Sequence, residues 1–107
     1  MKAAELESEI ERLAAAGANA ARDAVREAFA TLRKALSKGE VRAAEPDPAS
    51  PSGWRVNAWV KRGILLGFKY GNTVELYLTP NQDKWPFLDK DTLPLKHVGV
   101  QSGVRIV

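Results

Sequence analysis

Apolar residues recur every three or four positions through the first 36 residues, and this spacing constrains the fold more than any other feature of the chain. Leu6, Ile10 and Leu13 fall on one face of a helix. A second and longer stripe has five members, Ala21, Val25, Phe29, Leu32 and Leu36. The first third of the chain therefore predicts two helices.

The expected helix ends follow from the residues between and after the two stripes. Gly17 interrupts the first pattern, and Asn19 can cap the second helix by accepting a hydrogen bond from a free backbone N–H. Lys34 and Lys38 suit the negative end of the second helix, and Gly39 supplies its stop. We expect the first helix to bury little, because it is rich in alanine.

The pattern changes after Gly39. Residues 41–45 form a short extended candidate that leads into a loop at 46–53, where three prolines forbid regular structure. In the next segment Trp54, Val56, Ala58 and Val60 alternate as in a strand, whereas Val60, Ile64 and Phe68 fit a helix that starts after a cap at Asn57. We predict a short strand that turns into a buried helix, although Gly63 and Gly67 weaken that helix by ~1 kcal/mol each.

The last third predicts irregular β structure. Residues 70–72 form a turn signal, and residues 74–78 alternate as a strand. Residues 80–94 are rich in loop formers, with Trp85 and Phe87 as expected anchors. Residues 103–107 form another extended run, and because it is apolar we expect the chain to be a segment of a longer protein.

Composition narrows the function. A chain of 107 residues allows one domain, and it has no cysteine and a single histidine, His97. The lack of cysteine excludes thiolate zinc sites and cysteine nucleophiles, and a lone histidine cannot by itself build a metal site or a Ser-His-Asp relay. No transmembrane span or secretory signal is visible, so a cytoplasmic location is expected. The net charge of +3 is small, which makes nucleic acid an unlikely partner.

Five segments, taken in order, resemble one protein family. The longest is WRVNAWVKRGILLGF, in which two tryptophans, an asparagine and a basic pair precede an apolar run. The five segments are residues 39–45, 54–68, 87–90, 94–96 and 103–107. Together they resemble the N-terminal domain of the bacterial tetrahydrodipicolinate N-succinyltransferases, and the resemblance covers about residues 24–107.

The chain departs from the family pattern at several positions. The basic pair is Lys61-Arg62 where the family has two lysines, and Gly63 stands where the family has alanine. A proline-rich insert at 46–51 lengthens a turn, and residues 91–93 widen the gap before Pro94. The hexapeptide repeats that form the family's β-helix are not found in this sequence.

The resemblance implies an α+β fold. We expect a small, mainly helical N-terminal domain, with two to three helices plus short strands, that lacks the left-handed β-helix of the full enzyme. Residues 1–18 would form a helical extension, and residues 19–107 the family's N-terminal domain, ending before the hexapeptide-repeat catalytic domain. In the family, that β-helix forms a homotrimer and binds the coenzyme A thioester.

The resemblance also implies an activity. The full enzyme transfers a succinyl group from succinyl-CoA to tetrahydrodipicolinate, in lysine and diaminopimelate biosynthesis. For this chain we expect no catalytic residue, no metal and no bound cofactor, and no activity when it is alone. Its expected partners are the dicarboxylate substrate and the β-helix domain of the same enzyme.

Four basic residues are candidates for substrate binding. Strand alternation places Arg105 on the face opposite Val104 and Ile106, and a planar guanidinium can hold a carboxylate through two hydrogen bonds. The matching arginine of the family contacts substrate, so Arg105 is the first candidate. Its alternative role is a solvated arginine on an edge strand.

The weaker candidates are Lys61, Arg62 and Lys90. Lys61 and Arg62 lie near the start of the expected buried helix, where free N–H groups and two cations attract an anion. They could equally be exposed cations matched by carboxylates elsewhere. Lys90 could line a substrate cleft, or form a local charged turn with Asp89.

A second hypothesis is a non-catalytic basic helical module that binds nucleic acid or a protein partner. It rests on the basic pI, on Lys61 and Arg62, and on the neighbouring tryptophans, which could stack nucleobases. Aromatic residues in an apolar run more often belong to the core, and we expect this for Trp54 and Trp59.

Overall fold

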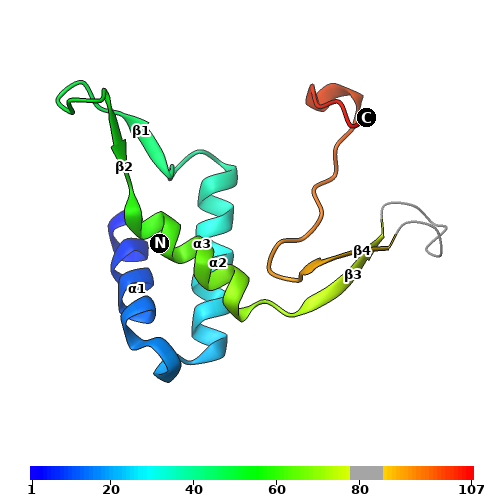
Figure 1. The fold of residues 1–107 in the computed structure, drawn as a ribbon, viewed down its shortest axis with the longest axis horizontal. Coiled ribbons are helices and arrows are strands. Elements are labelled where there is room, and N and C mark those ends of the chain that lie inside the picture. The colour runs from blue at the N-terminus through cyan, green and yellow to red at the C-terminus, as the bar shows by residue number, and fades with distance from the viewer. Residues whose placement is uncertain (78–85) are drawn as a thin grey trace.

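Three α-helices pack around one apolar core in the part of the chain that the computed structural model describes, residues 1–77 and 86–107 (Figure 1). They are α1 (Ala3–Ala16), α2 (Arg22–Ser37) and α3 (Ala58–Tyr70). Their buried apolar side chains form one cluster, to which all three helices contribute. The α+β fold class, with helices and short antiparallel strands, is confirmed.

Helix α1 contributes more to the core than its composition suggested. The predicted face is confirmed, because Leu6, Ile10 and Leu13 are all fully buried. The expectation that this helix buries little is therefore wrong. Three large side chains suffice, because their helical spacing places all of them on the one face that the other two helices cover. The domain boundary expected at residue 18 stays a prediction.

Helix α2 confirms the longer stripe at its centre. Val25, Phe29 and Leu32 are buried, and Leu36 is partly buried. Ala21 is exposed, because it occupies the N-cap position and precedes the helix. Gly39 ends the helix as predicted: its φ is 75°, and its N–H donates to the carbonyl of Leu36 at 3.1 Å.

The predicted cap at Asn19 is wrong. Asn19 lies in a short 3₁₀ turn, Gly17–Asn19, that separates α1 from α2. Ala21 therefore takes the N-cap position of α2, and no side chain caps that end. The sequence pattern placed the helix start two residues too early, because the 3₁₀ turn uses up the residues between the helices.

Helix α3 begins after Asn57, as predicted, and Val60 and Ile64 of the predicted stripe pack in the core, but the centre of the buried face is shifted away from Phe68. The buried residues are Trp59, Val60, Gly63, Leu66 and Gly67. Phe68, expected on the buried stripe, is 45% exposed. The two glycines decide this orientation, because the core can approach the helix closely only along the side where they lie.

The glycine contacts are very close. A Cβ atom at Gly67 would lie 2.3 Å from the ring of Phe29, and one at Gly63 would lie 2.4 Å from Cδ2 of Leu32. Neither position can hold a larger residue without displacing the core. The glycines that weaken the helix in isolation thus allow it to pack against α2.

A short hairpin precedes α3. Strand β1 (Ala44–Pro46) pairs antiparallel with β2 (Trp54–Val56), which confirms the strand expected before the helix. Turns form between the strands, as predicted, but Pro46, expected in the loop, is the last residue of β1. Trp54 is 51% exposed, so its expected place in the core is wrong.

Only one of the two tryptophans was therefore assigned correctly. Trp59 is buried, as expected. Trp54 lies on a two-stranded sheet that has no further layer over it among the described residues. An aromatic side chain on such a sheet stays exposed, because no second layer packs against it.

A second hairpin follows α3. Strand β3 (Thr73–Tyr77) confirms the strand expected near 74–78 and pairs antiparallel with β4 (Pro86–Lys90). The strand β4 was not predicted, because it lies in the segment 80–94 that was expected to be rich in loop. Phe87 is 48% exposed and is not a core anchor, and Trp85 lies outside the described residues.

The chain beyond β4 extends away from the helices (Figure 1). A short 3₁₀ turn, Val100–Ser102, is followed by Gly103 at φ 73°. The extended run at 104–107 pairs with no strand of the described chain, so the expected edge strand is wrong. An alternating pattern makes a strand only where a partner strand lies beside it. We call the β3–β4 hairpin and residues 91–107 the arm.

Candidate functional site

The first-turn cations of α3 have different surroundings. Arg62 bridges to α1: its Nε donates to a carboxylate oxygen of Glu11 at 2.9 Å, and its Nη2 donates to the other oxygen. The hydrogen bond from Arg62 lowers the pKa of Glu11. Lys61 is exposed and makes no ion pair with the described residues. Arg62 is thus matched by a carboxylate, whereas Lys61 is available to an external anion.

Arg105 lies in the arm, beyond the 3₁₀ turn. It is exposed, and no carboxylate of the described chain forms an ion pair with it. Lys90 ends β4, opposite Thr73, and is partly buried. Among the described residues no hydrogen bond or ion pair joins Arg105, Lys90 and the α3 pair, so the structure does not bring the four candidates into one site. Their roles stay predictions.

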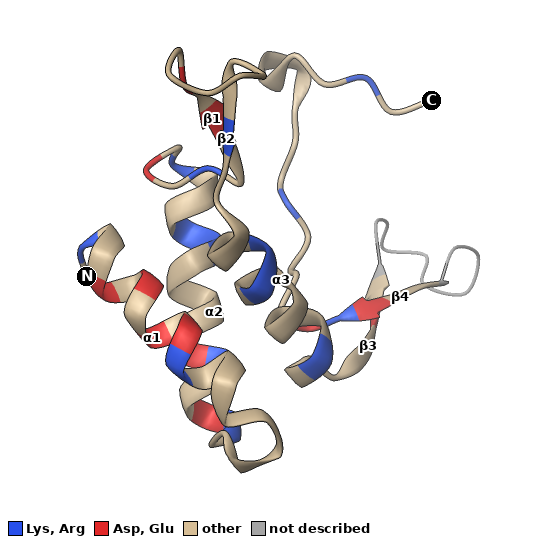
Figure 2. Ribbon diagram, turned by 60° about the vertical axis from the view of Figure 1, so that its left-hand side comes forward, with Lys and Arg blue, Asp and Glu red and all other residues tan. Residues whose placement is uncertain are grey.

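Charge is distributed unevenly over the helices (Figure 2). The charged residues of helix α1 are mostly acidic, whereas those of α3 are all basic. The exposed members of the basic group on α3 are Lys61, Arg62 and Lys69. The basic surface of α3 attracts carboxylates, which agrees with a role in binding an acidic small molecule or an acidic protein segment.

A polar network that the sequence analysis missed joins the arm to α2. Arg26 donates to both carboxylate oxygens of Asp91, at 3.0 and 2.9 Å, and to the carbonyl of Tyr70 at 2.7 Å. Asp91 also accepts the N–H of Asn72 at 2.9 Å. We call this network the Arg26–Asp91 clamp.

Two further contacts strengthen the same junction. Arg22 donates to the side-chain oxygen of Asn72 at 2.5 Å, and the Thr92 hydroxyl donates to the carbonyl of Gly67 at 2.7 Å. Asp91 and Thr92 lie in the segment 91–93, which the sequence analysis interpreted as a departure from the family pattern. That interpretation did not extend to a contact with α2, because no local pattern relates these residues to Arg26.

The clamp shifts the titration of its members. The hydrogen bonds from Arg26 lower the pKa of Asp91, and the Asn72 N–H adds to the effect. The same hydrogen bonds raise the pKa of Arg26. Both groups are therefore charged at neutral pH, and the clamp acts as a structural ion pair. It holds no group suited to proton transfer near pH 7.

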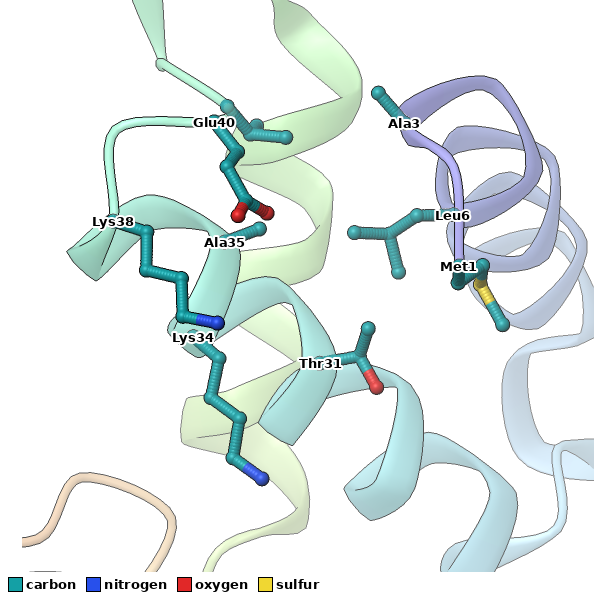
Figure 3. Close-up of a pocket in the computed structure, with 9 residues that line it drawn as sticks. Met1, Ala3, Leu6, Thr31, Lys34, Ala35, Lys38 and Glu40 are labelled. Carbon is teal, nitrogen blue, oxygen red and sulfur yellow. The ribbon is translucent and has the colours of Figure 1, made fainter.

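A small pocket lies between the start of α1 and the end of α2 (Figure 3). Its volume is about 220 Å³, and Leu6 points from α1 toward Lys34, Lys38 and Glu40 on the opposite wall. The two lysines could hold an anion, but Glu40 opposes it. Among the described residues no group of three His, Asp or Glu side chains could hold a metal ion.

No helix among the described residues is both long and apolar enough to cross a membrane.

The chain is less compact than a globular domain of its length. Its radius of gyration is 16.5 Å, whereas a compact chain of this length has about 13 Å. The arm accounts for this difference, since it leaves the helical core.

Comparison with known proteins identifies the family. The model of the tetrahydrodipicolinate N-succinyltransferase N-terminal family matches residues 5–70, which contain all three helices. A 2,3,4,5-tetrahydropyridine-2,6-dicarboxylate N-succinyltransferase of Granulibacter bethesdensis is 37% identical over 91% of this chain and 33% of its own length. Proteins of the same name from Leptothrix cholodnii and Brucella ovis are 34% and 36% identical, over 78% and 62% of this chain.

These relatives are much longer than the chain, which spans about a third of their length or less. The match nevertheless includes the two tryptophans, the asparagine and the basic pair around the start of α3. The chain therefore belongs to the tetrahydrodipicolinate N-succinyltransferase N-terminal family.

Proposed function

We propose that the chain is the N-terminal domain of an acyltransferase that moves a succinyl group from succinyl-CoA to tetrahydrodipicolinate. The observation that carries this proposal is the family match over α1, α2 and α3, together with relatives that are named as N-succinyltransferases. The proposed enzyme is a cytoplasmic homotrimer in lysine and diaminopimelate biosynthesis. Its β-helix domain is the proposed partner of this chain.

The proposed reaction is a direct transfer. Tetrahydrodipicolinate takes up water at its imine and opens to a primary amine. That amine attacks the thioester carbonyl, so a C–N bond forms, the C–S bond breaks, and the amine proton leaves to solvent or to the coenzyme A thiolate. No covalent intermediate with the enzyme is required. This chain has no cysteine that could serve as a nucleophile.

The proposed contribution of this chain is to hold the dicarboxylate. Arg105 and Lys61 are exposed and have no carboxylate partner among the described residues, so both can donate hydrogen bonds to a substrate carboxylate. Arg62 ranks lower, because Glu11 already holds its guanidinium. Lys90 ranks lower as well, because it is partly buried at the end of β4.

The test uses a chimera in which residues 1–107 replace the matching part of the Granulibacter relative. An active chimera supports the proposed function, and an inactive, folded chimera contradicts it. In the active chimera, Arg105→Lys keeps the charge but loses the planar two-point contact. We expect KM for the dicarboxylate to rise roughly ten- to a hundredfold, with KM for succinyl-CoA and the melting temperature unchanged.

The matched control is Arg42→Lys. Arg42 is exposed and makes no ion pair within the described residues, so its replacement should leave both KM values unchanged. Steady-state kinetics with each substrate varied separately measures the difference. An unchanged dicarboxylate KM in Arg105→Lys would remove Arg105 from the site.

One observation favours the second hypothesis, a nucleic-acid-binding module. Trp54 is half exposed on the β1–β2 hairpin, where it could stack on a base. The adjacent Arg55, however, is paired with Glu45, which reduces the positive charge near the ring. Salt-dependent binding of single-stranded DNA, weakened by Trp54→Ala, would support this hypothesis. The family match makes the enzyme domain the better-supported function.

A further inference from the structure

An open groove lies between α1 and α3, on a side of the core that no described residue covers. Ala14, Leu65 and Leu66 form its apolar floor, and Arg62 and Lys69 flank the two leucines along α3. Its volume is about 290 Å³. Leu65 is 54% exposed, so the groove presents an apolar centre between two cations. We call it the α3 groove.

The two cations differ in how they are neutralised. Arg62 is held by Glu11 of α1. Lys69 lies over the ring of Tyr70, at 5.7 Å from its centroid, and makes no ion pair with the described residues. An occupant of the α3 groove should therefore bring an apolar side chain for the leucines and a carboxylate for Lys69.

The β3–β4 hairpin presents this combination. The strand register places Leu76 opposite Phe87, and Val74 opposite Asp89. Side chains at positions two apart share a face of a strand, so these four residues form one face. Phe87 is half exposed and Asp89 is exposed, so the face offers an apolar side chain beside a carboxylate.

The spacing of the two surfaces also agrees. Two residues of a strand, from Phe87 to Asp89, span about 6.8 Å. One turn of helix, from Leu65 to Lys69, spans about 6 Å. A phenylalanine placed on Leu65 would thus bring the carboxylate of Asp89 near the ammonium of Lys69.

A hairpin cannot fill the groove of its own copy. The Arg26–Asp91 clamp ties both ends of the hairpin to α2, whereas the groove lies between α1 and α3. Figure 1 shows the hairpin directed away from the helices. The hairpin can therefore reach an α3 groove only in a second copy of the chain.

We propose that the hairpin of one copy docks into the α3 groove of a second copy, with Phe87 on Leu65 and Leu66 and with Asp89 paired to Lys69. Direct pairing of two α3 helices is disfavoured, because it brings the basic residues of both copies together. The docking is head to tail. In a pair joined by one such contact, one copy keeps a free groove and the other keeps a free hairpin. Association therefore continues beyond the dimer unless a ring closes.

The contact is small and its affinity is correspondingly weak. An interface of one hairpin face and one groove falls below the roughly 1,000 Å² of a stable complex. Sedimentation equilibrium of the 107-residue chain between about 10 μM and 1 mM therefore tests it. We expect the average mass to rise with concentration past that of a dimer, and added salt to reduce the rise.

Substitutions locate the contact. Leu65→Ser and Phe87→Ser should each leave the chain monomeric. Lys69→Glu and Asp89→Lys should each weaken association several-fold, and the double variant Lys69→Glu with Asp89→Lys should restore it, because the charges are exchanged. Lys34→Glu is the matched control: it makes the same change of charge on α2, away from the groove, and should leave association unchanged.

Other results overturn the proposal. One is a monomer at 1 mM. Another is a double variant that associates no better than the single variants. A third is association that persists in Phe87→Ser and is lost in Val100→Ser with Ile106→Ser, which would assign it to the exposed apolar end of the arm. A mass that stops at the dimer and is unchanged in Phe87→Ser would assign the association to a different, symmetric contact. Circular dichroism checks that each variant keeps its helices.

Discussion

The helical core and the arm treat apolar side chains in opposite ways. In α1, α2 and α3 the large apolar residues find partners within the described chain, and many of them are fully buried. In the arm most of them stay exposed, among them Phe87, Leu88, Val100 and Ile106. The core is thus stabilised by burial, whereas the arm offers apolar surface for contacts that these residues do not make among themselves.

The junction between the two regions is mainly polar. The Arg26–Asp91 clamp and the hydrogen bond from Thr92 to Gly67 connect the arm to α2 and α3, and Leu93 adds an apolar contact with the core. Gly71 is part of this junction: a Cβ atom there would lie 2.6 Å from the Thr92 hydroxyl. The difference teaches that the arm's orientation depends on a few directional contacts.

The largest expected effect comes from matched leucines in the two regions. Leu32→Ala removes a fully buried side chain and should lower the free energy of unfolding by about 2–5 kcal/mol. Leu88→Ala removes an exposed side chain of the arm and should change it by less than about 0.5 kcal/mol. Urea denaturation measures both. Equal losses would break the comparison, because they would place Leu88 in a buried cluster.

The next effect concerns two glycines. Gly67→Ala places a methyl group against the buried ring of Phe29, at a cost of about 1–3 kcal/mol, and the helix propensity of alanine offsets at most about 1 kcal/mol. Gly99→Ala in the arm should be neutral, since the nearest atom is the side-chain oxygen of Gln101 at 3.8 Å. Thermal unfolding followed by circular dichroism compares them. A stabilised Gly67→Ala variant would contradict the close packing of α2 and α3.

Loss of the Arg26–Asp91 clamp should free the arm from the core without unfolding the core. Asp91→Asn or Arg26→Met removes the charged contacts, so the amides of β3 and β4 should exchange hydrogen faster while those of α1 and α2 keep their rates. Arg12→Met is the control, because it breaks an ion pair within α1 alone. Faster exchange in the helices of Asp91→Asn would show that the clamp stabilises both regions.

The smallest effect is on pH dependence. The pKa of Asp91 is lowered from its ordinary value of 3.8, so the clamp contributes fully above that value and is lost as the pH falls through the lowered pKa. The amide of Asn72 should therefore change its NMR shift in this acidic range, and the change should vanish in Asp91→Asn. A transition of the Asn72 amide that survives in Asp91→Asn would assign it to another carboxylate.

Sequence patterns predicted the helices and strands that local interactions decide. The stripes of α1 and α2, the stop at Gly39, the start of α3 after Asn57 and the strand β3 all follow from periodicity and from backbone preferences. The basic pair and its neighbours also indicated the family, because the order and spacing of a motif can be read from one sequence. The family match over residues 5–70 contains this segment.

The candidate site was less predictable. Lys61, Arg62, Lys90 and Arg105 were chosen for their charge and position, but charge alone does not reveal partners. Arg62 is engaged by Glu11, which lies 51 residues earlier. Arg26 and Asp91 are 65 residues apart, and no local pattern relates them. Contacts at such separations depend on how the helices are placed.

The sequence by itself determined where this chain is helical, where its helices stop and which family it belongs to, because hydrophobic spacing and backbone freedom act within a few residues. Tertiary structure alone decided which face of α3 is buried, why Gly63 and Gly67 are needed, and that Trp54, Phe68 and Phe87 are exposed. Burial is a property of the whole packing arrangement. A side chain is in the core only if other elements cover it, and most large apolar side chains of the arm are left exposed.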